Sequence, residues 1–122
     1  MNSSLFERIG GNETIEKASS KLYENIMADD RINGFFANVD VKKQARKMHA
    51  FLTYAFGGPS LYTGMSMRNA HQHVAKQGLN DDHFNAMIED IRKTLQEIGK
   101  SEDLINEVVG SIEKHRRDVL CK

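Results

Sequence analysis

The sequence predicts a single all-α domain spanning residues 1–122. Apolar residues recur at three- and four-residue spacing along most of the chain, and no stretch alternates with period two for long enough to form a strand. Glycines at positions 10–11, 57–58, 78 and 99 divide the chain into pieces of helix length. A chain of 122 residues can bury a core without disulfides, and its one cysteine, Cys121, predicts none.

Two helices are predicted before residue 29. Ser4 and Glu7 form a capping-box pattern that opens a short helix, which stops at the first glycine pair. Asn12 is the expected cap of a second helix ending near Ala28. Its apolar stripe places Tyr23 on the buried face. A polar connection over residues 29–40 then contains the aromatic pair Phe35-Phe36.

The third predicted helix covers residues 41–56, with Asp40 as a cap. At about 100° per residue, Gln44, Lys47 and Phe51 share one edge of it with Met48 beside them. His49 projects from the opposite edge. Polar and aromatic side chains therefore line the same wall.

Three further helices are predicted after the Gly-rich break over residues 57–66. The first covers about 65–77, the second 80–98, and the last runs from a Ser101 cap through His115 and Val119. His83, near the start of the second, is expected at the surface.

His71 lies on the apolar face of the helix predicted over residues 65–77. Its neighbours at helical spacing are Met67, Ala70, Val74 and Ala75, and none of them can hydrogen-bond the ring. A buried imidazole without a partner is costly, and a metal would satisfy it. The alternative from the pattern alone is an ordinary core histidine.

The order and spacing of many short segments resemble the group I truncated haemoglobins, and the cyanobacterial members most closely. The resemblance covers nearly the whole chain and rests on segments 5–11, 29–32, 50–58, 78–79, 83–84 and 115–120, with Tyr23, Phe35-Phe36, Met67-Arg68 and Ala70-His71. It implies a truncated globin fold, in which a 2-on-2 helical sandwich surrounds haem.

The resemblance also implies roles for individual residues. His71 matches the proximal iron ligand, and Tyr23 matches a distal tyrosine that donates a hydrogen bond to iron-bound dioxygen. Gln44 matches the distal position that faces the ligand. The haem-contacting set it implies is Phe35, Phe36, Gln44, Lys47, Met48, Phe51, Tyr54, Met67, His71, Phe84 and His115.

Two of these positions raise specific alternatives. Cyanobacterial members usually have a histidine where this chain has Lys47, so Lys47 could close the sixth iron site, provided that its amine is deprotonated. It could equally extend to water or pair with a haem propionate. We rank His49 below it as a sixth ligand. His115 aligns with a histidine that bonds covalently to a haem vinyl group in some members, or it is an ordinary histidine near a helix end.

The balance of 17 basic and 17 acidic residues, without a long block of either sign, argues against nucleic acid or a membrane as partner. We expect a cytoplasmic monomer that reversibly binds dioxygen, nitric oxide and carbon monoxide. One alternative is a nitric oxide dioxygenase that needs a separate reductase, with Tyr23 and Gln44 at the reacting gas. Another is a haem-free helical sensor or scaffold.

Overall fold

The computed structural model describes residues 5–36, 41–56, 72 and 76–121, and within them every regular element is helical. The elements are α1 (Leu5–Arg8), α2 (Gly11–Met27), the 3-10 helix η1 (Asn33–Phe36), α3 (Val41–Ala55), α5 (Asp81–Glu97), α6 (Glu102–Glu113) and α7 (Arg116–Leu120). The predicted all-α class is confirmed. The Gly-rich break and the helix predicted over residues 65–77, with Met67 and His71, lie almost entirely outside the described residues.

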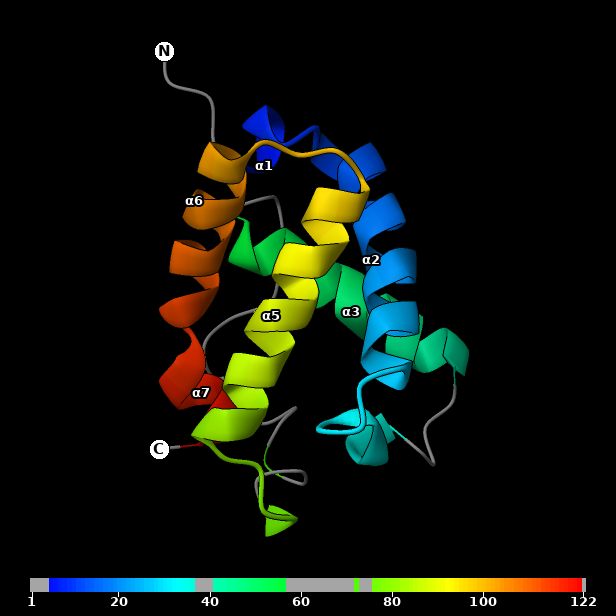
Figure 1. The fold of residues 1–122 in the computed structure, drawn as a ribbon, viewed down its shortest axis with the longest axis vertical. Helices are drawn as coiled ribbons and strands as arrows, with labels where there is room; N and C mark the ends of the chain where they lie inside the picture. The colour runs from blue at the N-terminus through cyan, green and yellow to red at the C-terminus, as the bar shows by residue number, and fades with distance from the viewer. Residues whose placement is uncertain (1–4, 37–40, 57–71, 73–75, 122) are drawn as a thin grey trace.

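The helices form two packed pairs. Helix α2 packs against α3, while α5 packs against α6 and also against α2 and α7. In Figure 1, α5 and α6 run side by side in opposite directions, and α3 crosses behind α5. Helix α1 rests on α2 and α6 at one end of the molecule.

The core lies where these helices meet. Its largest fully buried side chains are Ile9, Ile15, Leu22, Ile26, Leu52, Phe56, Ile91, Leu95, Ile105, Val108 and Ile112. Most of them belong to the predicted apolar stripes, so helical periodicity identified the buried faces of α2, α5 and α6 correctly.

The helix starts agree with the sequence in two cases and differ in one. Asn80 caps α5, since its Oδ1 accepts hydrogen bonds from the backbone of Asp82 and His83, and Ser101 Oγ accepts one from Leu104 N–H at 3.3 Å before α6. The predicted Asn12 cap of α2 is wrong, because the cap residue is Gly10 at φ +115°. A Cβ at Gly10 would clash with Thr14 Oγ1, so both backbone and space favour glycine.

The last predicted helix is broken in two. Helix α6 ends at Glu113, and His115 is the cap residue of α7, with φ −100° and ψ 3°. The buried positions Ile112 and Val119 still flank His115 on one face. The prediction of a continuous helix was therefore wrong, whereas the face on which His115 lies was predicted correctly.

Candidate functional site

The predicted distal residues come from α2 and α3, which pack against each other. Tyr23 on α2 and Gln44 on α3 are both half-buried. Met48, one turn after Gln44, is only 5% exposed and belongs to the hydrophobic core. Lys47 is exposed to solvent. The structure thus places a hydroxyl and an amide at the edge of the core.

Four aromatic side chains form a partly accessible rim on that core. Phe35 and Phe36 belong to η1, and Phe51 and Tyr54 belong to α3; all four are half-buried and packed against the core. Burying an aromatic side chain contributes about 1.5–3 kcal/mol, so large rings left partly accessible can gain from a flat apolar partner. This is the set expected to contact a porphyrin.

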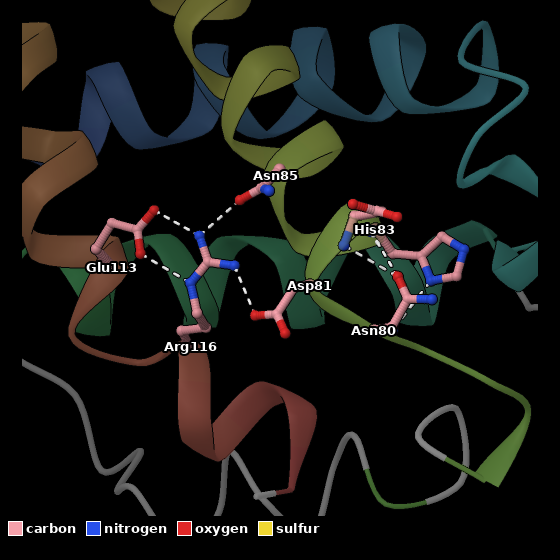
Figure 2. A network of polar contacts seen from close by, with 7 residues as sticks. Asn80, Asp81, His83, Asn85, Glu113 and Arg116 are labelled. Atoms are coloured by element: carbon pink, nitrogen blue, oxygen red, sulfur yellow. Dashed lines mark hydrogen bonds and ion pairs between the residues drawn. The ribbon is translucent and has the colours of Figure 1, made fainter.

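His83 is connected to this rim. Its ring meets Phe35 edge-on, with centroids 4.9 Å apart and planes at 77°. The Nδ1 atom accepts a hydrogen bond from the Asn80 backbone N–H at 3.0 Å, which closes the capping box at the start of α5 (Figure 2). His83 is half-buried, so the histidine expected at the surface also packs against the rim. The sequence feature that indicates this arrangement is the three-residue spacing of Asn80 and His83, which is the spacing of a capping box.

His115 packs on the other end of the rim. Its ring lies 4.8 Å from the Tyr54 ring, centroid to centroid, at an angle of 45°. Burial lowers the pKa of His115, and the nearby Lys114 lowers it further, while Asp118 opposes both effects. Burial therefore favours the neutral imidazole, which has a nitrogen lone pair available for bonding.

Arg116, the next residue, anchors α7 to α5. Its guanidinium donates to Asp81 at 3.0 Å, to Asn85 at 2.6 Å, and to both carboxylate oxygens of Glu113 (Figure 2). It also lies 4.4 Å from the centroid of the Phe84 ring. Phe84, predicted to contact haem, is buried and has one ring face covered by this cation.

A second polar cluster joins the α2–η1 connection to α5. Asp29 forms a bidentate pair with Arg31, whose guanidinium also reaches Glu89 at 2.6 Å. Asp29 also interacts with the carboxyl of Asp90, which is 7% exposed, and within the described residues the buried Oδ2 atom of Asp90 has no hydrogen-bond partner. Arg31 holds the pKa of Asp29 well below its usual range.

The pKa of Asp90 is shifted in the opposite direction to that of Asp29. Burial first, and then the neighbouring Asp29 carboxylate, raise the pKa of Asp90 to about 7. A proton on Asp90 provides the donor that its buried oxygen otherwise lacks. The sequence analysis missed this pair, although Asp90 stands directly beside Ile91 on a helix with an apolar stripe.

Comparison with known proteins identifies the family. The bacterial-like globin family model matches residues 4–121. A group 1 truncated hemoglobin of Synechocystis is 50% identical over 121 residues, covering 97% of this chain and 98% of that protein. The chain belongs to the bacterial-like globins and, among them, to the group 1 truncated haemoglobins.

Solved structures agree with this assignment. The globin matches a 2/2 hemoglobin of Synechococcus, solved in the cyanomet state with covalently attached heme, at a TM-score of 0.89 and 45% identity, covering 98% of this chain and all of that one. The Fe(III) form of a truncated hemoglobin from Tetrahymena pyriformis matches at a TM-score of 0.86 and 36% identity, covering 97% and 98%.

The predicted family and the 2-on-2 fold are thereby confirmed, and haem is the cofactor that this family carries. The roles of individual residues stay predictions, and His71 and Met67 lie outside the described residues. In the part of the globin that the structure describes, no helix is both long and apolar enough to cross a bilayer.

Proposed function

We propose that this globin binds haem through His71 and reversibly binds dioxygen and other diatomic gases. The observation that carries the proposal is the half-buried aromatic rim of η1 and α3, next to a hydroxyl and an amide, in a chain of a haem-carrying family. Aromatic and apolar groups with a few polar side chains are the surroundings that a porphyrin requires. Haem iron, when bound, supplies the site that takes up the gas.

Tyr23 and Gln44 are the proposed distal residues. Dioxygen bound to iron carries partial negative charge, and a hydrogen bond to a charged group contributes about 1.5–3 kcal/mol. A bond from the Tyr23 hydroxyl would therefore slow gas release by about one to two orders of magnitude. The Gln44 amide can orient the hydroxyl or donate a second bond.

Lys47 and His115 are proposed to act at the edges of the site. The exposed position of Lys47 supports the alternative in which its ammonium stays in water or pairs with a propionate. The neutral imidazole of His115, held against Tyr54, supports a covalent bond to a haem vinyl group. The imidazole nitrogen would add to one vinyl carbon and a proton to the other, without net oxidation.

Haem titration of the purified chain tests the proposal. We expect a Soret band that saturates at one haem per chain, and a His71→Ala variant that loses the proximal-histidine spectrum. His73→Ala, two positions away on the same predicted helix, is the matched control and should behave as the parent. A chain without a Soret band would instead support the haem-free scaffold.

The His115 bond has its own test. After incubation of the ferrous protein, acid-butanone extraction should leave haem on the parent chain and remove it from His115→Ala. Complete extraction from the parent would contradict the bond, but it would leave reversible haem binding intact. Mixing the oxygenated protein with nitric oxide distinguishes reversible gas binding from the nitric oxide dioxygenase alternative. The enzyme must form nitrate rapidly and in a stoichiometric amount.

A further inference from the structure

The charges of this globin are segregated although they cancel in total. All 17 acidic residues lie outside residues 41–80, and that segment contains six of the 17 basic ones. The segment therefore has a formal charge of +6 and the rest of the chain −6, with histidines neutral. Charge counted over the whole chain concealed this separation.

The structure places four of the six cations on one helix. Lys42, Lys43, Arg46 and Lys47 are all exposed on α3, which contains no acidic residue. We call these four residues the α3 cationic face. Within the described residues, Lys42, Arg46 and Lys47 form no ion pair, whereas most cations of α2 and α5 are paired, Lys21 with Glu97 and Arg92 with Glu102 among them.

The spacing concentrates the charge. Lys42 and Arg46 are four residues apart, as are Lys43 and Lys47, so two adjacent rows of cations extend over about 8 Å of helix. Like charges at this spacing destabilise a helix. An acidic partner would relieve the repulsion, and this helix has no acidic side chain of its own to do so.

We infer that the α3 cationic face docks the acidic surface of a one-electron carrier protein, with an iron–sulfur cluster or a flavin as its redox group. The inference rests on the proposed haem function. Gln44 and Phe51 belong to the same helix, so a partner on its outer side sits about one helix diameter, roughly 10 Å, from the proposed haem site. One electron passes from the reduced carrier to ferric iron, giving ferrous iron and the oxidised carrier, and no bond is made or broken.

Charge complementarity favours a compact protein over a long polyanion. The cationic face covers only two helical turns, while the rest of the chain has a formal charge of −6. A nucleic acid or an anionic membrane would extend beyond the face onto the rest of the chain, whose net charge is negative like its own. A small acidic protein would meet the positive face alone and be oriented by the dipole of the globin.

Reduction of the ferric haem protein by a reduced plant-type ferredoxin, a small acidic carrier used as a probe, tests the inference. Stopped-flow rates should fall with rising ionic strength. In Lys42→Glu/Arg46→Glu the second-order rate constant should fall about tenfold at low salt. The control Lys17→Glu/Lys93→Glu, with the same net charge, reverses cations on α2 and α5 and should stay within about twofold. Equal rates in the two variants would overturn the inference.

Binding without electron transfer gives an independent readout. In nitrogen-15 NMR spectra of the haem protein, oxidised ferredoxin should shift amides of residues 42–47, and the shifts should vanish in Lys42→Glu/Arg46→Glu. If the protein bound heparin or phosphatidylserine vesicles more tightly than ferredoxin, and this binding depended on the α3 cationic face, the inference of a protein partner would be overturned. If the chain shows a Soret band but its reduction and its ferredoxin binding do not depend on the α3 cationic face, only the docking is refuted. If the parent chain binds no haem, the proposed function and the docking are both refuted.

Discussion

The buried carboxyl pair predicts an unusual dependence of stability on pH. In the folded globin Asp90 keeps its proton up to about pH 7, whereas in the unfolded chain it ionises near 3.8. Between these values the folded state binds more protons, so the free energy of unfolding falls as pH rises. Above pH 7 the loss is complete. Asp29, whose pKa is lowered, acts oppositely and stabilises the fold above pH 4.

The magnitude follows from the shift. A rise from 3.8 to about 7, at about 1.4 kcal/mol for each pKa unit, corresponds to about 4 kcal/mol of unfolding free energy. Asp90→Asn should remove this dependence, because an amide donates to Asp29 at every pH. The hydroxyl of Thr94 donates to the backbone carbonyl of residue 90, so that hydrogen bond is retained.

Urea denaturation of the haem protein at about pH 5 and pH 8 measures the effect. Because only the part of the titration above pH 5 falls in this window, we expect the parent to lose about 2.5–3 kcal/mol more than Asp90→Asn between these values. Asp30→Asn, an exposed neighbour of Asp29, is the matched control and should follow the parent. Parallel curves for the parent and Asp90→Asn would refute the shared proton.

Three further substitutions test the site and its support. Tyr23→Phe should speed dioxygen dissociation about 10- to 100-fold in stopped-flow measurements, and an unchanged rate would exclude the distal hydrogen bond. Lys47→Ala should leave the ferric absorption spectrum unchanged, as its exposed position indicates; a shift from six-coordinate low-spin to five-coordinate iron would show that it ligates. Arg116→Ala should lower the free energy of unfolding by about 2–3 kcal/mol, because several charge-assisted bonds and the contact with Phe84 are lost, and a change below about 0.5 kcal/mol would contradict the anchoring role.

Much of the fold could be predicted because helical periodicity records burial directly. The bounds of α2 and α5 were predicted to within a residue or two, and Ser101 was predicted as the cap of α6. The break before α7 was not, because local propensity favours continuation from Glu113 to Arg116 and only long-range contacts oppose it. Arg116 binds Asp81 and Asn85, more than thirty residues away, and nothing local records that pairing.

Candidate site residues can be named from the sequence where a residue type carries its chemistry alone, but not where the chemistry arises from a pair. Tyr23 and Gln44 could be named as candidates from motif positions, and their distal roles stay predictions. The lowered pKa of His115 depends on burial, and the raised pKa of Asp90 depends on burial and on Asp29, 61 positions earlier in the sequence. Such pairs form only after the helices pack, because the free energy that shifts each pKa comes from desolvation and a neighbour's charge. The connection that carries Phe35 and Phe36 begins at Asp29, and Asp90 belongs to α5. We therefore expect the packing of the aromatic rim against α5 to depend on pH through this carboxyl pair.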